Sequence, residues 1–151
     1  MTTPYKTPIS VLVVIYTPDL QVLLMERADH PGYWQSVTGS QNPGETLRET
    51  AIREVAEETG LDALQFELTD RQQQNVYAIY PEWRHRYAPG VEYNTEHVWS
   101  LKLPGPLPIK LAAREHLSYR WRPYQEAVQL CFSPSNVAAI SLLPQWLATD
   151  S

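Results

Sequence analysis

A run of β-branched and large apolar residues near the N-terminus, Ile9 to Tyr16, most constrains how this chain can fold. Apolar and polar residues do not alternate along it, which is typical of a strand buried on both faces. A turn at 17–20 leads to a second predicted strand, Gln21 to Arg27, and we expect the two strands to pair as a hairpin. A short extended piece follows at 33–39. The chain is therefore built around a sheet.

A helix is predicted from Thr46 to Thr59, directly after the turn "NPGE". Thr46 with Glu49 three residues later matches a capping box, in which each residue satisfies a backbone N–H of the other. Gly60 suits the left-handed position that commonly follows the last helical residue. Both ends of this helix are thus marked by local sequence signals.

The rest of the chain continues the pattern of strands and then helix. Three strand-like stretches are expected at about Arg71 to Tyr80, Tyr93 to Leu103 and Leu117 to Arg122. Ser133 followed by Pro134 is typical of a helix start, and we expect a closing helix to about Leu147. A mixed sheet with helices on its faces is an α/β or α+β architecture. The length of 151 residues favours one domain over residues 1–151.

Composition narrows the class of protein. The net charge of −5 speaks against a nucleic-acid binder, which normally carries a basic stripe. No apolar run reaches the ~18 residues that a membrane helix needs, so no membrane partner is expected. The start, "MTTPYKTP", has no apolar signal core, and Cys131 has no second cysteine with which to form an internal disulfide. A cytoplasmic protein that acts as a monomer is the expectation.

Three glutamates of the predicted helix suggest a cation site. Glu54 and Glu58 are one helical turn apart and Glu57 lies beside them, so the three carboxylates are expected on one edge. Glutamate-rich helices are usually solvated faces, yet like charges at this spacing destabilise an isolated helix. A hard divalent cation removes that penalty, and Mg²⁺ suits a few carboxylates with waters and substrate phosphates.

The residues around these carboxylates have supporting roles. Arg53 can reach Glu49 or Glu57, or pair with Glu45 if the preceding loop folds back, which favours an orienting role. Gly39 ends the extended piece, where its carbonyl could approach a metal ion closely.

The whole string from residue 39 to residue 61 has a recognisable spacing. It reads Gly39, five residues, Glu45, seven residues, and then Arg53-Glu54-Val55-Ala56-Glu57-Glu58-Thr59-Gly60-Leu61. This string resembles the Nudix box, G-x5-E-x7-R-E-U-x-E-E-x-G-U with U aliphatic, at every defined position. The resemblance implies an α/β/α sandwich around a mixed sheet that hydrolyses phosphoanhydrides with Mg²⁺, or with Mn²⁺ as a substitute.

The resemblance also implies roles for individual residues. Glu54, Glu57 and Glu58 would bind the metal and activate water, and the Gly39 carbonyl would be an extra ligand. Arg53 and Glu45 would form the orienting pair. A further carboxylate outside the box is often a ligand in this family. Glu115 and Glu96 are the candidates, and Glu115 is preferred because it lies in a loop just before a predicted strand. His116 beside it is either a base or a simple turn residue.

Other stretches resemble a narrower group of this family, the bacterial dihydroneopterin triphosphate diphosphatases. They are "YKTPISVLVVIY", "WQSVTGS", "RHRYAPGVEYNTEH" and "REHLSYRW", while the match weakens after Gly60, across "PGPLPIKLAA" and in the last helix. The resemblance implies release of pyrophosphate from a small-molecule triphosphate, dihydroneopterin triphosphate, in folate biosynthesis. The expected substrate contacts are Lys6, Arg27, Thr38, Tyr77, Ala78, Ile79, Tyr80, Arg84, Glu115 and Ser133.

Several alternatives stay open at this point. Arg84 and Arg86 would share a side, facing the triphosphate, if their stretch is extended. The same chemistry on another substrate would make the chain a nucleotide-pool enzyme acting on dATP or an oxidised dGTP, since a pterin and a purine present similar edges. A Nudix-fold binding module without hydrolysis is a further alternative, although such a protein would be expected to lose box carboxylates that this chain keeps.

Overall fold

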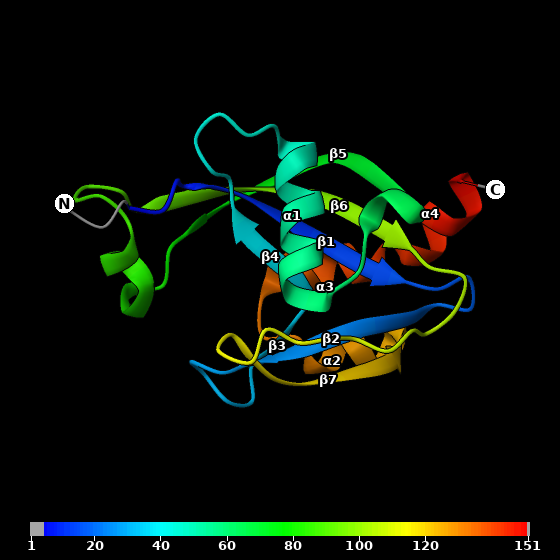
Figure 1. The fold of residues 1–151 in the computed structure, drawn as a ribbon. Helices are drawn as coiled ribbons and strands as arrows, with labels where there is room; N and C mark the ends of the chain where they lie inside the picture. Colours follow the sequence, from blue (N-terminus) through cyan, green and yellow to red (C-terminus); the bar gives the residue numbers. More distant parts are fainter. Residues whose placement is uncertain (1–4, 151) are drawn as a thin grey trace.

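The computed structural model describes residues 5–150. Its centre is a 7-stranded mixed sheet in the order β3-β2-β1-β6-β5, with β4 on β1 and β7 on β2 (Figure 1). The strands are β1 Ile9–Tyr16, β2 Gln21–Arg27, β3 Trp34–Gln35, β4 Val37–Ser40, β5 Glu67–Ala78, β6 Tyr93–Lys102 and β7 His116–Pro123. The α+β class expected from the sequence is confirmed.

The predicted buried strand lies at the middle of this sheet. β1 runs parallel to β6 along its whole length, from Ile9 opposite Thr95 to Tyr16 opposite Lys102. Its first half is also paired with β4, antiparallel. Residues 10–16 are all buried, because β1 has a hydrophobic layer on each face. The absence of alternation in its sequence is therefore explained by burial on both sides.

The expected hairpin of β1 and β2 forms only at its turn. The two strands share one register pair, Tyr16 with Val22, and then separate. β1 continues with β4 and β6, whereas β2 pairs with β7 from Gln21–Pro123 to Arg27–His116. The prediction of a hairpin was thus wrong for most of its length, because both strands find longer partners that are distant in sequence.

The helix with the glutamates, α1 Leu47–Thr59, matches its prediction closely. Thr46 is the N-cap, its side chain accepts from the Glu49 N–H, and the Glu49 side chain accepts from the Thr46 N–H. Gly60 ends the helix in the left-handed conformation at φ 75°. α1 covers one face of the sheet with Ala51 and Val55, both fully buried.

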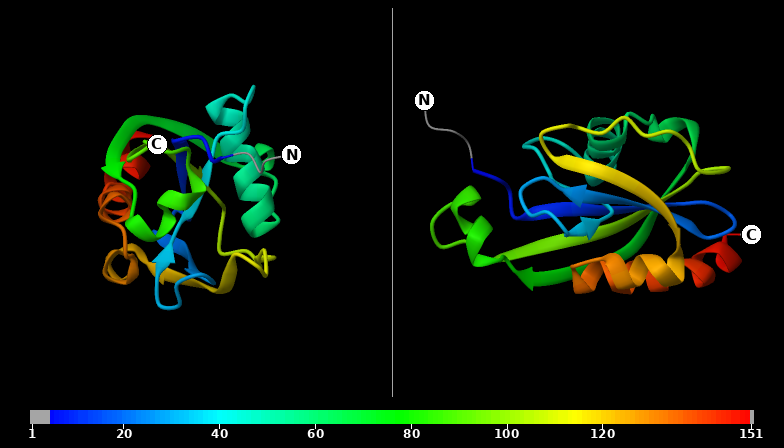
Figure 2. Two further views of the ribbon diagram at one scale, coloured as in Figure 1. Left: turned by 90° about the vertical axis from the view of Figure 1, so that its left-hand side faces the viewer. Right: turned by 90° about the horizontal axis from the view of Figure 1, so that it is seen from below.

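Three helices cover the other face: α2 Tyr124–Leu130, α3 Pro134–Ser141 and α4 Leu143–Thr149. Figure 2 shows α1 and these helices on opposite sides of the sheet. The single closing helix expected after Ser133 is instead two helices that meet at Leu142, and α2 was not predicted. Pro144 lies in the first turn of α4, where its missing N–H and its ring favour a new helix start over continuation of α3.

The middle of the chain departs from prediction in two places. β5 begins at Glu67 and is interrupted by a bulge between Asp70 and Gln73, where Gln72 has φ 55°. Residues Pro81–Arg86 form a 3₁₀ helix, η2, so Arg84 and Arg86 do not share a side of an extended segment. A second 3₁₀ helix, η1, spans Ala63–Gln65. Among residues 5–150, none of the helices has both the length and the apolar character needed to cross a bilayer.

Candidate active site

A cavity of about 500 Å³ lies where β4, β5, β6, β7 and the N-terminus of α3 come together. Most of the residues expected from the sequence to contact substrate line it: Lys6, Arg27, Thr38, Tyr77, Ala78, Ile79, Tyr80, Glu115 and Ser133. Arg84 is the exception. Its guanidinium Nε donates to the Ile79 carbonyl at 3.3 Å, and it is not part of the lining. The 3₁₀ turn of η2 places Arg86 in the wall instead.

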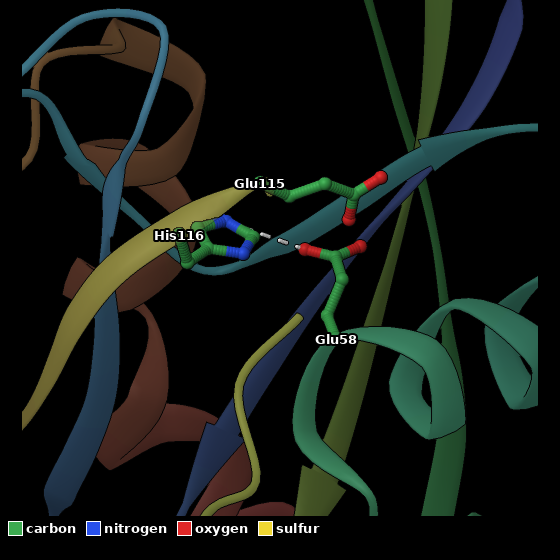
Figure 3. A group of neighbouring side chains, drawn as sticks. All are labelled: Glu58, Glu115 and His116. Carbon is green, nitrogen blue, oxygen red and sulfur yellow. Dashed lines mark ion pairs between the residues drawn. The ribbon is translucent and has the colours of Figure 1, made fainter. Parts of the chain in front are cut away.

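An acidic cluster lies at one end of this cavity. Glu58 comes from the last turn of α1, while Glu115 lies in the turn just before β7 and His116 is the first residue of β7. Ligand atoms of the three residues lie within 4.8 Å of one another, and their side chains point toward a common centre (Figure 3). His116 Nε2 is 3.6 Å from Glu58 Oε1. Residues 57 positions apart are thus brought together only by the packing of α1 on the sheet.

Glu58 is unusual because it is buried without partners. Its side chain is 2% exposed, and neither carboxylate oxygen has a hydrogen-bond partner among the described residues. Burial raises the pKa of Glu58 well above its ordinary value, and the nearby Glu54 and Glu115 carboxyls raise it further, while the Thr38 backbone N–H only partly opposes this rise. A buried carboxylate without a partner is costly, so the site favours a cation that takes these oxygens as ligands.

His116 is expected to be neutral at this position. Burial lowers its pKa to about 4, with Arg27 acting in the same direction. Its contact with Glu58 is therefore not an ion pair near neutral pH. Nδ1 has no hydrogen-bond partner among residues 5–150. Two carboxylates and a neutral imidazole form a donor set that fits a divalent cation.

The other two box glutamates of α1 lie in different surroundings. Glu54 is 9% exposed, and burial raises its pKa, although Arg53 opposes that shift. Glu57 is 53% exposed and contacts Arg53 Nη1 at 3.3 Å. Neither residue lines the cavity. Glu54 and Glu58 lie close enough to shift each other's pKa, as the helical spacing predicted, whereas Glu57 is turned toward solvent.

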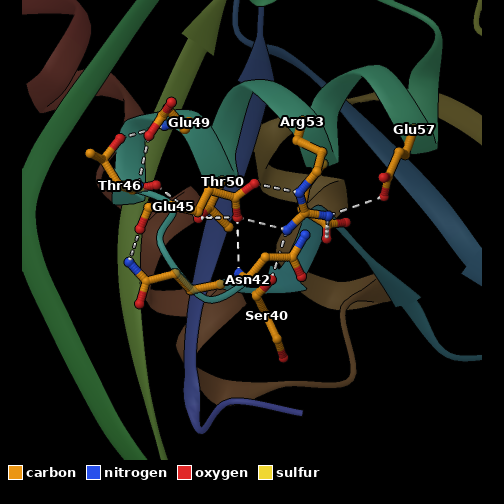
Figure 4. A network of polar contacts seen from close by, with 10 residues as sticks. Ser40, Asn42, Glu45, Thr46, Glu49, Thr50, Arg53 and Glu57 are labelled. Atoms are coloured by element: carbon orange, nitrogen blue, oxygen red, sulfur yellow. Dashed lines mark hydrogen bonds and ion pairs between the residues drawn. The ribbon is translucent and has the colours of Figure 1, made fainter. Parts of the chain in front are cut away.

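Arg53 is the centre of a polar network that includes Glu45 and Ser40 (Figure 4). Its Nε and Nη2 donate to the two oxygens of Glu45 at 2.7 and 3.0 Å, and Nη1 donates to Glu54 Oε1 at 2.7 Å. Nη2 also donates to the Ser40 carbonyl at 2.9 Å, which connects α1 to β4. The hydrogen bonds from Arg53 lower the pKa of Glu45 to about 2. Of the three partners considered from the sequence, Glu45 and Glu57 are found here, while Glu49 closes the capping box.

Gly39 allows this network to approach β4. A β-carbon at position 39 would overlap the carboxyl group of Glu54. Glycine at this site leaves room for the Glu54 carboxyl against β4, and any larger residue would have to displace that side chain; the backbone itself has no positive φ here. Gly39 lines the cavity opposite Val11 of β1, and a role for its carbonyl as a metal ligand stays a prediction.

Sequence reasoning missed several features of the cavity. Asp29 accepts from Arg27 at 2.7 Å through both oxygens and from Arg86 at 3.1 Å, and its pKa falls to about 2 because of the Arg27 hydrogen bonds first. Arg27 also lies 4.4 Å from the ring centroid of Trp83. The acid two residues after Arg27, just past the end of β2, was the available signal.

Aromatic side chains form another part of the cavity wall, in which Tyr80 was expected from the sequence and Phe132 was not. Tyr33 stacks on Phe132 with ring centroids 4.4 Å apart, and Tyr80 and Trp83 lie beside Phe132 at 6.2 Å. Phe132, Tyr80 and Trp83 line the cavity. They present faces on which a planar heterocycle can stack.

Comparison with known proteins agrees with this geometry. The NUDIX domain family model matches residues 6–143. The chain is 46% identical over 139 residues to the dihydroneopterin triphosphate diphosphatase of Escherichia coli strain K12, covering 90% of this chain and 91% of that protein. It is 39% identical over 139 residues to the Haemophilus influenzae protein of the same name, covering 90% and 87%.

A solved structure gives the same result in three dimensions. The structure of the E. coli dihydroneopterin triphosphate pyrophosphohydrolase superposes with a TM-score of 0.86 at 45% identity, covering 91% of this chain and 95% of that chain. Family match, sequence identity and superposition all extend over most of the chain. The chain therefore belongs to the NUDIX domain family.

Proposed function

We propose that this chain hydrolyses dihydroneopterin triphosphate to dihydroneopterin monophosphate and pyrophosphate, as a step of folate biosynthesis. The observation that carries the proposal is the cluster of Glu58, Glu115 and His116 at one end of a cavity that also holds cationic and aromatic side chains. Two relatives with the corresponding name cover about nine tenths of the chain. One molecule with a triphosphate at one end and a flat heterocycle at the other fits this arrangement.

A divalent cation is part of this proposal, with Mg²⁺ as the physiological ion and Mn²⁺ as a substitute. Glu58 and Glu115 would hold it, with Glu54 and Glu57 of the same helix and the Gly39 carbonyl as further candidates. The unpartnered oxygens of Glu58 are the structural sign that these residues fit a cation. When bound, the ion supplies an activated water and neutralises charge on the phosphates.

The protein's own groups then bind and orient the substrate. Arg53 holds the Glu54 carboxylate in place through the hydrogen bonds described above. Lys6 and Arg27 would contact the triphosphate, and charge-assisted hydrogen bonds of this kind suit phosphate oxygens. Thr38, Ser133 and the segment Tyr77–Tyr80 would contact the rest of the molecule. Arg84, which lies outside the lining, would act only by holding the Ile79 carbonyl.

The organisation of the protein is also proposed. The chain would act as one domain over residues 1–151, as a monomer, and in the cytoplasm. Because the site described above is formed from one chain, no second copy is needed to complete it.

Product analysis tests the proposal directly. The purified protein is incubated with dihydroneopterin triphosphate and Mg²⁺, and the products are separated and quantified over time. We expect dihydroneopterin monophosphate and pyrophosphate to form together in one step, and no turnover in excess chelator. A diphosphate intermediate that later decays, or full activity in chelator, would contradict the proposal. Parallel reactions with dATP and an oxidised dGTP measure preference, and a higher kcat/KM for either would replace the pterin as substrate.

A further inference from the structure

Two buried acceptors lie in the cavity wall away from the acidic cluster. Glu96 is 4% exposed and Asn94 is 2% exposed, and both line the cavity from β6. Glu96 Oε1 and Asn94 Oδ1 have no hydrogen-bond partner among the described residues. A buried polar atom without a partner is rare in folded proteins, because its lost contact with water is not replaced. Because both residues line the cavity, these two acceptors are candidates for contact with a bound molecule.

The sheet explains why both side chains face the same way. Positions 94 and 96 are two apart on β6, so their side chains leave the same face. The register places Glu96 beside Ser10 of β1 and Asn75 of β5, and Asn94 beside Tyr77. Asn94 Nδ2 donates to Ser10 Oγ at 2.7 Å and to Tyr77 Oη at 3.1 Å, which orients the amide. A row of polar groups therefore crosses the sheet under the N-terminal turn of α3.

The surroundings of Glu96 leave its charge only partly compensated. Burial raises the pKa of Glu96, and hydrogen bonds from Ser135 and Asn75 oppose that shift. No ion pair of Glu96 with an arginine or lysine is found within residues 5–150. A structural carboxylate of the kind seen at Glu45 is held by an arginine, whereas Glu96 has capacity for further N–H donors.

Glu96 belongs to a different part of the cavity from the metal-ligand candidates. The group of residues that could hold a cation contains Glu58, Glu115 and His116, from α1 and β7, and does not include Glu96. Both sets line one cavity, so a single extended molecule can contact both. With phosphates at the acidic cluster, the heterocycle would be the part that reaches β6.

We propose that Glu96, assisted by Asn94, selects the heterocycle by accepting hydrogen bonds from a 2-amino-4-oxopyrimidine edge, as found in pterins and in guanine. This inference rests on the proposed function for the position of the phosphates. That edge presents a ring N–H next to an exocyclic amino group, and a carboxylate has lone pairs on both oxygens to accept them. Adenine presents a bare ring nitrogen and a C–H there, so its acceptor would face the Glu96 carboxylate.

The strength of this selection follows from the cost of an unpaired group. A site that hydrogen-bonds a substrate N–H discriminates strongly against an analogue that lacks it, since the buried group is then left unpaired. Hydrogen bonds to a charged partner correspond to changes of about tenfold to a hundredfold in binding. The second oxygen of Glu96 and the Asn94 amide extend the match beyond a single bond.

A binding measurement tests the inference without catalysis. Neopterin, a fluorescent pterin without phosphates, is titrated with the full chain in chelator. Wild type is compared with Glu96→Gln, which keeps the size but replaces one acceptor oxygen by a donor. Glu92→Gln is the matched control, since Glu92 lies two residues before Asn94, just ahead of β6, but is exposed and outside the cavity lining. We expect neopterin affinity to fall at least about tenfold in Glu96→Gln only. Equal affinities in all three proteins would overturn the inference.

Turnover of two substrates separates selection from general damage. In Glu96→Gln, kcat/KM for dihydroneopterin triphosphate should fall at least about tenfold relative to kcat/KM for dATP. An unchanged ratio would overturn the inference. If Glu96→Gln does not fold, inhibition of the wild type by dGTP and dITP serves instead, because they differ only in the 2-amino group. We then expect dITP to inhibit about tenfold more weakly, and equal inhibition would overturn the inference.

The two proposals can fail separately. A wild type that binds neopterin through Glu96 but does not hydrolyse dihydroneopterin triphosphate in Mg²⁺ would refute the proposed function and leave the recognition by Glu96 standing. A wild type that hydrolyses it, with neopterin affinity and substrate ratio insensitive to Glu96, would refute the recognition alone.

Discussion

Two glutamates at opposite ends of α1, Glu45 and Glu58, differ in their hydrogen-bond partners, their burial and the direction of their pKa shifts. Glu45, just before the helix, accepts hydrogen bonds from Arg53, Thr50 and the Asn42 N–H, and its pKa falls to about 2. Glu58, in the last helical turn, is more deeply buried, has no hydrogen-bond partner among residues 5–150, and has a strongly raised pKa. The first is a completed structural contact, and the second needs a ligand.

This difference distinguishes the glutamates of the motif that stabilise the fold from those that can bind a cation. A carboxylate that is already paired with arginine contributes to the folded state and has little capacity left for a cation. A buried carboxylate without partners destabilises the metal-free fold, and such a site persists where a bound ion compensates it. Glu54 lies between the two, with one oxygen on Arg53 and burial raising its pKa.

The largest effect is expected on kcat when Glu58, the carboxylate without a hydrogen-bond partner among residues 5–150, is replaced. In Glu58→Gln, kcat should fall about a thousandfold or more, since a metal ion contributes several kcal/mol of transition-state stabilisation. The metal-free protein should melt at the same temperature or higher, because an uncompensated buried charge is removed. Steady-state kinetics and melting in chelator measure the two effects.

The control for this change is Glu126→Gln, at an exposed position of α2. It should leave both activity and melting unchanged. Glu115→Gln should resemble Glu58→Gln in activity. Wild-type turnover by Glu58→Gln would show that the acidic cluster is not the metal site.

A smaller effect on kcat/KM is expected at Gly39, which lies against the Glu54 carboxyl. In Gly39→Ala the new methyl group would overlap the Glu54 carboxyl and displace it, so kcat/KM should fall about tenfold to a hundredfold, at a stability cost of about 1–3 kcal/mol. Gly44→Ala is the matched control, because its φ of 79° is unfavourable for alanine but open space surrounds the position. It should lose about 1 kcal/mol of stability and keep full activity. Equal activity loss in both variants would exclude the Glu54 contact as the cause.

Replacement of Arg53, the partner of Glu45, should change mainly the stability of the protein. Arg53→Lys keeps the charge but cannot donate to Glu45, Glu54 and the Ser40 carbonyl together, so the free energy of unfolding should fall by about 1–3 kcal/mol. Activity should fall about tenfold through loss of Glu54 positioning. Urea denaturation and kinetics measure the two. Unchanged stability with abolished activity would mean that Arg53 acts on substrate and not on the fold.

The smallest effect is a pH dependence of opposite sign at the two ends. The folded pKa of Glu45 lies below its unfolded value, so its stabilisation is complete above about pH 4.5 and is lost as the pH falls toward about 2. The folded pKa of Glu58 is raised, so its contribution is complete below about pH 4.5 and is lost as the pH rises toward the folded value.

Denaturation of the metal-free protein across this pH range measures the pH dependence of stability that each of the two glutamates contributes. The difference in unfolding free energy between wild type and Glu45→Gln should shrink toward pH 2, while that between wild type and Glu58→Gln should become less favourable to wild type above pH 4.5. His116, whose pKa is lowered to about 4, does not act on Glu45, so its contribution largely cancels in the Glu45→Gln difference. His116 contacts Glu58 at 3.6 Å, so the Glu58→Gln difference is compared above about pH 7.5, where the imidazole is neutral in the folded and unfolded chains alike. If the unfolding free-energy differences of the two variants changed with pH in the same direction, the proposed contrast between Glu45 and Glu58 would be wrong.

Local features of the fold were predictable because local interactions decide them. The capping box of Thr46 and Glu49, the left-handed Gly60 and the Ser133 N-cap all depend on neighbours within a few residues. The predictions failed where partners are distant. The separation of β1 from β2 depends on partners far away in the chain. The break at Leu142, by contrast, has a local cause, Pro144, that the prediction overlooked.

The same division holds for the site. Spacing alone placed Arg53, Glu54 and Glu58 on one helix, and together with Gly39 and Glu45 it identified the family, because a helix converts sequence intervals into positions on its surface. Which glutamate is paired and which is left without a partner was decided by tertiary packing. The start of β7 brings Glu115 and His116 to Glu58, and β4 carries Ser40 to Arg53. Burial and partners set the pKa of a carboxylate, and both depend on segments far apart in the chain, so only the folded structure distinguishes Glu58 from Glu45.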